Sequence, residues 1–466
     1  MLQLSLPRTE GPGAPPLYEQ LYRAICGQIR SGQLTAGERL PGKRSLAAEL
    51  RLSVNTVDTA YQQLVAEGWL EARPRSGYFV RPYEGPLAGP SAAPLPGTAV
   101  AAPRWEYDLS TGGVDTSLFP FRTWGRIQKE LLYSQPQLLN HGHAQGDESL
   151  RRAIADYLRA YRGVDCDPCQ VVVGAGAEYL LGLLGHLVAG STAALEDPGY
   201  ARPLRILQNN GLPCVPVPVD DQGLVPEALA KSGASLVYLT PSHQFPTGAV
   251  MPAGRRAALL RWAAETPDRL ILEDDYDSEF RFDIRPLPSL QGMAGREGPV
   301  VYLTTFSRSL APSIRIACMV LPAPLLARFK AAFGSYASTV SRFEQQTLCT
   351  FLREGHFTRH LARARGVYRQ RMQALTRALD AAFGPGRLIF KGQHTGLHLL
   401  VQYPSGPGEA EMVARAKGAG VRLAGLSEYC MGPAAPCPPG TVVLGYGALA
   451  PQQIEPLARL LKELWA

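Results

Sequence analysis

Two patterns of apolar residues divide the chain. From Leu17 to Ile29 an apolar residue recurs at every fourth position, which predicts an amphipathic helix. From about residue 108 onward, short apolar runs of β type alternate with longer segments of helical pattern. The change of pattern predicts a small helical module near the N-terminus and a large α/β module after it.

Residues 1–82 are predicted to form a helix, a short helix, a third helix and a β-hairpin. A Pro-Gly pair precedes the short helix at Lys43–Leu50, and Ser53 stands where it can cap the third helix. Two short strands then flank a turn at residues 73–77. Helix, helix, helix and hairpin in this order are typical of a winged helix-turn-helix domain.

Residues 83–107 are rich in proline, alanine and glycine, with little charge and no periodicity. Such a composition is typical of a semi-extended linker. We therefore divide the chain into an N-terminal domain of residues 1–82, a linker of residues 83–107 and a large domain of residues 108–466.

In the large domain, several short apolar runs each end in a polar cluster. The runs comprise residues 171–173, 193–195, 236–239, 270–272 and 300–303. Their alternation with helical segments predicts a mainly parallel sheet covered by helices on both faces. Ligand sites of such sheets lie just past the carboxyl ends of the strands, so the polar clusters are the candidate site.

Composition narrows the class of protein. The chain has 466 residues, of which 45% are hydrophobic, enough for several domains with sizeable cores. No apolar run reaches about eighteen residues and the N-terminus lacks the pattern of a secretory signal, so we expect neither a membrane span nor export. Scattered cysteines suit a reducing cytoplasm. Cys166 and Cys169 lack further ligands at a metal-binding spacing, so no metal site is expected.

The net charge of +7 permits nucleic-acid binding. The third helix carries side chains that can reach base edges in a major groove, namely Asn55, Thr56 and Thr59. The second helix and the hairpin carry basic side chains that can pair with phosphates of any sequence, namely Lys43, Arg44, Arg73 and Arg75. These seven residues are the predicted DNA contacts, and the alternative is a small helical domain with a solvated basic face.

The N-terminal residues also carry a known motif. Residues 37–70 read GxxLPxxRxLAxxLxxSxxTVxxAYxxLxxEGxL, and the hairpin ends in SGYFV. With the leading helix, residues 16–80 resemble the GntR family of bacterial transcription regulators, which implies promoter DNA as a partner. Gly42 stands where that family usually has a hydroxyl residue, and Val54 where an arginine is common. Both departures are expected to alter operator affinity or choice.

The polar clusters of the large domain form an ordered set of motifs, namely GAGAEYL, EDPGY, SHQFPTG, EDDYDSEF and TTFSRSLAPSIR. In this order they resemble the fold-type I aminotransferases, which use pyridoxal 5′-phosphate. With its GntR-type head, the whole chain resembles the MocR/GabR-type regulators. The resemblance implies a fold-type I domain with a smaller C-terminal α/β subdomain. It also implies a homodimer, with a head-to-tail arrangement, since sites of this fold form at a dimer interface.

The resemblance assigns roles to single residues. Asp274 is implied to pair with the pyridinium nitrogen of the cofactor, Tyr276 to bond the ring 3′-oxygen and Tyr200 to stack on the ring. Asp274 stands in a run of three acids, so an acidic loop residue is the structural alternative. The implied phosphate site combines an arginine, two hydroxyls and the turn that opens a helix, namely Arg315, Thr305, Ser307, Gly176 and Ala177.

One residue of the motif departs from the family in its chemistry. The aminotransferase-like family has a lysine in TFSKS that forms an imine with the cofactor, whereas this chain has Arg308. A guanidinium stays protonated and its lone pairs are delocalised, so Arg308 cannot form that imine. Residues 440–446 also lack the arginine that pairs with the substrate carboxylate in many such aminotransferases, and Arg422 could contribute instead.

We therefore expect a DNA-binding transcription regulator whose large domain serves effector binding and dimerisation. That domain would sense a pyridoxal-phosphate-related or amino-compound ligand without covalent attachment. The alternative is a pyridoxal-phosphate-dependent aminotransferase with a DNA-binding head, which the missing lysine disfavours. A third possibility is a regulator whose large domain is only a dimerisation scaffold, and the retained Asp274, Tyr276 and Arg315 argue against it. A fourth is a deliberate lysine-to-arginine change that traps a non-covalent state.

Overall fold

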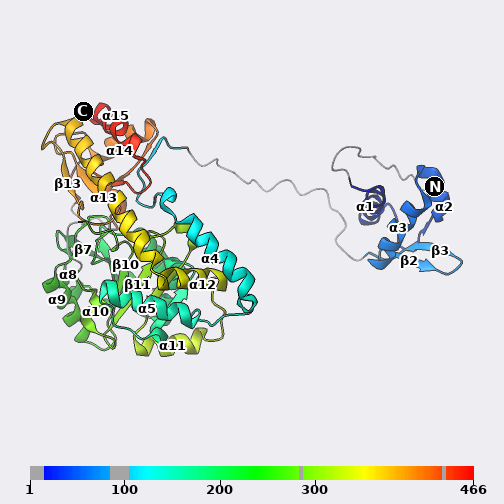
Figure 1. The fold of residues 1–466 in the computed structure, drawn as a ribbon, viewed down its shortest axis with the longest axis horizontal. Coiled ribbons are helices and arrows are strands. Elements are labelled where there is room, and N and C mark those ends of the chain that lie inside the picture. The colour runs from blue at the N-terminus through cyan, green and yellow to red at the C-terminus, as the bar shows by residue number, and fades with distance from the viewer. Residues whose placement is uncertain (1–14, 84–103, 283–286, 433–436) are drawn as a thin grey trace. The chain divides into compact units, whose positions relative to one another are not determined.

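The chain folds into two compact units, Met1–Ala102 and Pro103–Ala466 (Figure 1). The computed structural model describes residues 15–83, 104–282, 287–432 and 437–466. Most of the predicted linker at 83–107 lies outside the described residues, so its boundaries stay predictions. The two units are therefore described one at a time.

The N-terminal unit has the predicted order of elements. Helices α1 (Leu17–Arg30), α2 (Lys43–Leu50) and α3 (Val54–Ala66) are followed by a hairpin of β2 (Leu70–Arg73) and β3 (Gly77–Val80). A short strand that was not predicted, β1 (Arg39–Leu40), pairs with β3 on the side opposite β2. Three helices and a three-stranded sheet make this unit a winged helix-turn-helix.

The core of the N-terminal unit follows from the helical stripe. Leu21 and Ile25 of α1 are fully buried against the third helix and the hairpin. The predicted amphipathic helix is confirmed, and Leu17, the first residue of its stripe, is 41% exposed because it lies at the very start of the helix. Ser53 caps α3 as predicted, because its hydroxyl accepts a hydrogen bond from the Thr56 backbone N–H at 3.0 Å.

An eight-stranded sheet forms the centre of the larger unit, in the order β5-β12-β11-β10-β9-β6-β7-β8. Its strands are β5 (Val171–Gly174), β6 (Ala193–Asp197), β7 (Cys214–Asp220), β8 (Gly223–Leu224), β9 (Leu236–Leu239), β10 (Leu270–Asp275), β11 (Val300–Thr305) and β12 (Ala317–Val320). The pairs from β7 to β11 are parallel, while β12 runs antiparallel to both of its neighbours and β8 antiparallel to β7. The predicted mainly parallel sheet is therefore confirmed.

Helices cover both faces of this sheet. They are α4 (Phe121–Ser134), α5 (Glu148–Arg162), α6 (Ala177–Leu187), α7 (Ala201–Asn209), α8 (Pro226–Lys231), α9 (Ala253–Ala264), α10 (Leu290–Ala294), α11 (Ala323–Phe333) and α12 (Arg342–Arg353). Alternate residues of one strand enter different cores: Val171 and Val173 pack with α4, α5 and α12, whereas Val172 packs with α6 and α11. A strand buried on both faces explains the continuous apolar runs of the sequence.

A smaller C-terminal layer completes the unit. Its antiparallel sheet has the order β13 (Ile389–Lys391), β14 (His398–Gln402), β17 (Thr441–Gly445), β16 (Ala424–Gly425). Helices α13 (His356–Phe383), α14 (Glu409–Gly418) and α15 (Ile454–Trp465) accompany it. The long helix α13, yellow in Figure 1, runs from beside α12 to beside α15 and so joins this layer to the large sheet. Strand β4 (Tyr107–Asp108) pairs with β15 (Val421–Arg422), which brings the start of the unit to this layer.

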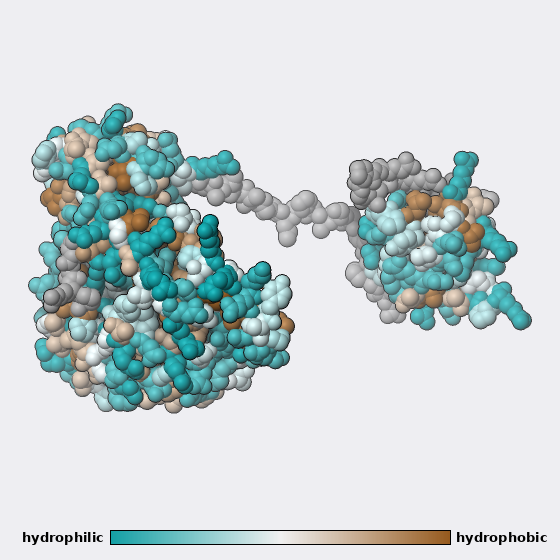
Figure 2. Space-filling view, in the orientation of Figure 1, coloured by the Kyte–Doolittle hydropathy of each residue, from teal (hydrophilic) through white to brown (hydrophobic). Residues whose placement is uncertain are grey.

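The surface agrees with two separately packed units. The faces drawn in Figure 2 are mainly hydrophilic with scattered hydrophobic patches, as expected where each unit buries its apolar side chains in its own core. Among the described residues, no helix has the length and apolar character needed to cross a membrane.

Candidate functional site

A cavity of about 560 Å³ opens at the carboxyl ends of the parallel strands. The walls come from the residues that follow β9, β10 and β11, the start of α6, the residues around α7, and segments near positions 110 and 425. Both the large sheet and the smaller layer therefore contribute to it. The position is the one expected for a ligand site in a parallel α/β sheet.

Most of the predicted cofactor residues line this one cavity. They are Tyr200, Asp274, Tyr276, Thr305, Ser307, Arg315 and Ala177, together with Arg308 and Arg422. Gly176 stands just behind the wall. A Cβ atom added to Gly176 would lie 2.5 Å from Nη2 of Arg315, and the residue has a positive φ of 96°. A glycine is thus required where the backbone passes close to the arginine.

Hydroxyls and an arginine gather at one end of the cavity. The hydroxyls of Thr305 and Ser307 lie 2.9 Å apart, and the Ser307 backbone N–H donates to Thr305 Oγ1. Arg315 Nη2 donates to the Ala175 carbonyl at 3.2 Å and to Glu178 Oε2 at 2.8 Å. Together with the N-terminus of α6, which begins at Ala177, these groups can satisfy the oxygens of a phosphate.

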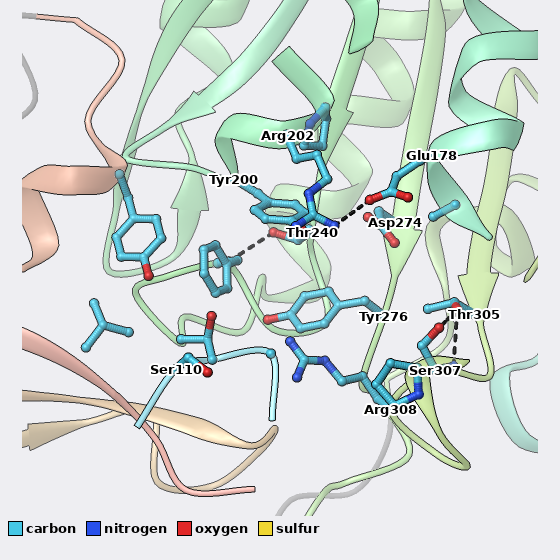
Figure 3. A pocket seen from close by; sticks show the side chains of 18 of the residues that line it. Ser110, Glu178, Tyr200, Arg202, Thr240, Asp274, Tyr276, Thr305, Ser307 and Arg308 are labelled. Carbon is cyan, nitrogen blue, oxygen red and sulfur yellow. Dashed lines mark hydrogen bonds and ion pairs between the residues drawn. The ribbon is translucent and has the colours of Figure 1, made fainter. Parts of the chain in front are cut away.

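Glu178 holds two arginines at this end of the cavity. Its second carboxylate oxygen accepts a hydrogen bond from Arg202 (Figure 3). A single carboxylate is therefore shared between Arg202 and Arg315. Burial by itself would raise the pKa of Glu178, but the hydrogen bonds from Arg315 and Arg202 outweigh it and the pKa is lowered. The two guanidinium groups share one negative charge, which leaves them an excess of positive charge.

Asp274 lies at the end of β10 and faces the cavity, whereas Asp275 faces the opposite side of the sheet. The Tyr238 hydroxyl donates to Asp274, and burial raises the pKa of Asp274 to about 7. Asp275 accepts from Arg162 Nε at 2.5 Å and from Tyr302 at 2.6 Å. Of the two neighbouring acids, Asp274 is therefore the one that a cationic ring nitrogen in the cavity could reach.

The two predicted tyrosines differ in their present contacts. The Tyr276 hydroxyl lies 3.0 Å from the carbonyl of His243, to which it donates, so it already has a partner. Tyr200 makes an edge contact with Phe245, with ring centroids 5.4 Å apart. His243 is buried, with Nδ1 3.0 Å from Asp277, and does not line the cavity. It is a buried histidine with a structural partner.

Arg308 extends into the cavity. Figure 3 shows its guanidinium beside Tyr276 and directed away from Ser307, toward the segment that contains Ser110. Within the part of the chain that the structure describes, Nη1 of Arg308 is buried without a hydrogen-bond partner. An unpaired buried donor is costly, so this position suits a ligand that supplies an acceptor.

Sequence reasoning missed several lining residues, namely Ser110, Glu178, Tyr238, Thr240, Glu428 and Tyr429. Tyr238 and Thr240 stand at the carboxyl end of a predicted strand, so their position was a usable signal. Thr240 also donates to the buried Glu196 at 2.7 Å, and burial raises the pKa of Glu196 to about 7. Glu178 directly follows the predicted Ala177 in the same motif, whereas Ser110, Glu428 and Tyr429 come from segments that only the folded chain brings to the cavity.

The predicted DNA contacts lie on the surface of the N-terminal unit. Arg44, Asn55 and Thr59 are exposed on α2 and α3, and Thr56 is half-buried beside the cap. Arg75 is exposed at the tip of the hairpin, where its φ is +59°.

Two of the predicted basic contacts already have acidic partners. Lys43 forms an ion pair with Asp58, and Arg73 pairs with Glu71 at 3.1 Å and stacks on Phe79. These two side chains must exchange partners to reach a phosphate, whereas no ion pair is found for Arg44 or Arg75 among the described residues.

The two units match two known families. Residues 17–80 match bacterial regulatory proteins of the gntR family, and residues 107–416 match aminotransferase class I and II. The fold and the cavity thus define a helix-turn-helix regulator joined to an aminotransferase-type domain. The chain belongs to the MocR-type family of DNA-binding transcription regulators, as its relatives show.

Similar proteins span nearly the whole chain. The HTH-type transcriptional regulator YdeL of Bacillus subtilis is 39% identical over 459 residues and covers 97% of both chains. The probable rhizopine catabolism regulatory protein MocR of Rhizobium meliloti is 34% identical over 94% of this chain and 91% of its own. The pyridoxine biosynthesis transcriptional regulator PdxR of Corynebacterium glutamicum is 34% identical, over 92% of this chain and 91% of its own.

Solved structures resemble the large unit. Kynurenine aminotransferase of Pyrococcus horikoshii, solved in complex with PMP, has a TM-score of 0.68 and 25% identity, over 78% of this chain and 91% of its own. An archaeal alanine:glyoxylate aminotransferase has a TM-score of 0.69 at 22% identity, which shows the fold alone. The expected fold-type I domain with its C-terminal subdomain is confirmed.

Proposed function

We propose that this regulator senses a pyridoxal-phosphate-type ligand in the cavity of its large unit and binds it without a covalent bond. The observation that carries the proposal is the grouping of Arg315, Ser307 and Thr305 at one end of the cavity with Asp274 on its wall. Bound ligand would alter the affinity of the N-terminal unit for promoter DNA, which requires different ligand affinities in two conformations of the protein.

The residues present fit pyridoxal 5′-phosphate. Gly176 leaves the space that Arg315 occupies, and a side chain there would block it. The raised pKa of Asp274, about 7, reflects a buried carboxylate without a cationic partner, which a protonated ring nitrogen would supply. When bound, the group would supply its phosphate and its electron-poor ring. The turn at Ala175 and Ala177 has no hydroxyl, so Arg315 would carry most of the phosphate contact.

Arg308 supports sensing over turnover. An aminotransferase requires an amine that attacks the cofactor aldehyde and then moves protons, and a guanidinium does neither at neutral pH. Lys330 and Lys391 are absent from the cavity lining. We therefore expect the ligand to bind and dissociate reversibly, without a covalent step.

We further propose a homodimer in the cytoplasm, with a head-to-tail arrangement. The support is an exposed apolar group on and after α4, whose members are 58–78% exposed: Phe121, Leu132, Tyr133 and Leu139. Large exposed apolar side chains in one segment favour an interface. Two copies would present two heads to a two-fold operator, as dimeric helix-turn-helix regulators do.

Absorbance spectroscopy with purified full-length protein tests the covalent part. We expect pyridoxal 5′-phosphate to bind with no borohydride-stable product at position 308, and a visible band of a lysine adduct to form in Arg308→Lys alone. The matched control is Arg261→Lys, which places a new lysine at an exposed position of α9 away from the cavity.

The results separate the alternatives. A borohydride-stable adduct on a cavity residue of the natural chain would contradict non-covalent binding. If neither the natural protein nor Arg308→Lys bound pyridoxal 5′-phosphate saturably, the sensing function would be contradicted. The alternative of a large domain that serves only as a dimerisation scaffold would then be favoured. Separately, the regulator reading requires salt-sensitive binding of promoter DNA by the full chain, measured by fluorescence anisotropy.

A further inference from the structure

The arginines that line the cavity differ in their partners. Arg202 and Arg315 share Glu178, and Arg422 lies 3.4 Å from Asp108. Arg308 has no ion pair among the described residues, and its Nη1 is both buried and without a hydrogen bond. The cavity therefore contains one guanidinium whose charge nothing in the described chain neutralises.

The groups around Arg308 do not supply the missing charge. Tyr276 and Tyr200 lie within its electrostatic reach, but burial raises the pKa of both phenols, so they stay neutral. His398 also lies within reach and is neutral, because burial first, and then the neighbouring His243 and Arg308, hold its pKa well below the usual value. These neutral neighbours leave the charge of the Arg308 guanidinium able to stabilise an incoming anion and to repel a second cation.

The unpaired guanidinium is separate from the phosphate end. Figure 3 shows Thr305 and Ser307 on one side and the Arg308 guanidinium reaching away from them beneath Tyr276, with Asp274 above that ring. A ligand with its phosphate at Arg315 and a ring nitrogen near Asp274 must therefore present another of its groups to Arg308. The positive charge and the planar array of N–H donors of the Arg308 guanidinium select which group can bind there.

We propose that Arg308 is a carboxylate receptor inside the effector site, so that the effector is a phosphorylated pyridine or similar compound with an acidic oxygen group beyond its ring. The inference rests on the proposed function, because it takes the phosphate end as given. A carboxylate can accept two parallel hydrogen bonds from the guanidinium, an aldehyde accepts one neutral bond, and an ammonium is repelled. Where the family lysine attaches the cofactor covalently, the arginine would instead discriminate between ligands by the charge of this group.

The test compares two ligands that differ only in that group. They are 4-pyridoxic acid 5′-phosphate, with a carboxylate, and pyridoxamine 5′-phosphate, with an amine. Neither reacts with lysines, so calorimetric titration of the full chain reports simple binding. We expect the carboxylate compound to bind at least about tenfold more tightly, the difference typical of charge-assisted hydrogen bonds.

Arg308→Gln keeps a side chain that can donate hydrogen bonds but removes its charge. The preference for the carboxylate ligand over the amine ligand should therefore fall to within about twofold. Arg261→Gln is the matched control and should keep the full preference, because Arg261 lies exposed on α9. Arg315→Ala should weaken both ligands alike, since each has the same phosphate. The ratio of the two affinities in each variant is the readout.

Failure of this inference differs from failure of the proposed function. Equal binding of the two ligands by the natural chain, or a preference that survives in Arg308→Gln, overturns the carboxylate receptor while the phosphate site stands. Absence of binding by either ligand to the natural chain and to every variant overturns the proposed function and the receptor together.

Discussion

The carboxyl group of Asp274 is predicted to make stability depend on pH in the ligand-free protein. Burial raises its pKa from 3.8 to about 7, so the folded state holds the proton more tightly than the unfolded state does. Its stabilising contribution is fully present below about pH 4 and is lost as the pH rises through about 7. Relative to Asp274→Asn, the natural protein should lose roughly 3 kcal/mol of unfolding free energy between pH 5 and pH 8.

Urea denaturation at several pH values measures this difference. Glu196, whose pKa burial also raises to about 7, contributes in the same direction in both proteins, and the Asp274 charge adds to its shift, so its change in Asp274→Asn belongs to the measured difference. The control is Asp268→Asn on the exposed surface, which should leave the pH profile unchanged. A constant difference between natural protein and Asp274→Asn across this range would show that Asp274 ionises normally.

Glu178 is predicted to compete with the ligand phosphate. Its carboxylate occupies Arg315 and Arg202, so a phosphate must displace it. Glu178→Gln should therefore tighten binding of pyridoxal 5′-phosphate by about two- to fivefold, the range expected for a partly exposed ion pair. Titration of this variant beside Glu265→Gln, an exposed acid after α9, checks the effect. Weaker binding would instead mean that Glu178 positions the arginines for the ligand.

The elements of the DNA-binding unit predict a contrast between two adjacent basic residues of α2. Arg44 is exposed, whereas Lys43 pairs with Asp58 on α3. Arg44→Ala should lower the slope of log affinity against log salt concentration by about one, because one phosphate contact is lost. Lys43→Ala should lower it by less. Anisotropy with one DNA fragment at several salt concentrations measures both, and equal slopes for the two variants would contradict the contrast.

At the scale of elements, the sequence predicted what depends on local pattern. The parallel strands were found because each is a short apolar run, and Ser53 was found because a cap acts on the next turn of the same helix. Strand β1 was missed because Arg39–Leu40 is too short to carry a period and forms only by pairing with β3. The antiparallel direction of β12 is likewise a property of the sheet, which no pattern within residues 317–320 could indicate.

At the scale of the molecule, the cavity shows where sequence reasoning ended. Asp274, Tyr276 and Arg315 were predicted to share one site because their motifs resemble those of a family whose members bring these positions together, and all three line the cavity. The sharing of Glu178 by Arg202 and Arg315 could not be foreseen, since it joins side chains 24 and 137 positions apart. Whether the Arg308 guanidinium has a partner also depends on every segment that folds around it.

Coupling between the two units gives the last prediction, which follows from thermodynamic linkage. If pyridoxal 5′-phosphate changes the affinity of the full chain for an operator by some factor, then that operator must change the ligand affinity by the same factor. A coupling of about 5- to 150-fold is typical of allosteric proteins. The operator can be a fragment selected in vitro by the full chain itself.

The measurement is a pair of titrations, operator with and without ligand, and ligand with and without operator. Arg315→Ala should lose both responses because it removes the phosphate contact, whereas Arg261→Gln should keep both. Two factors that agree and differ from one would establish that ligand and DNA bias the same conformational equilibrium. Tight binding of both ligand and operator, with both factors equal to one, would mean that ligand binding in the cavity does not affect DNA binding by the N-terminal unit. The large unit would then serve another purpose than sensing, since a ligand with equal affinity for both states shifts nothing.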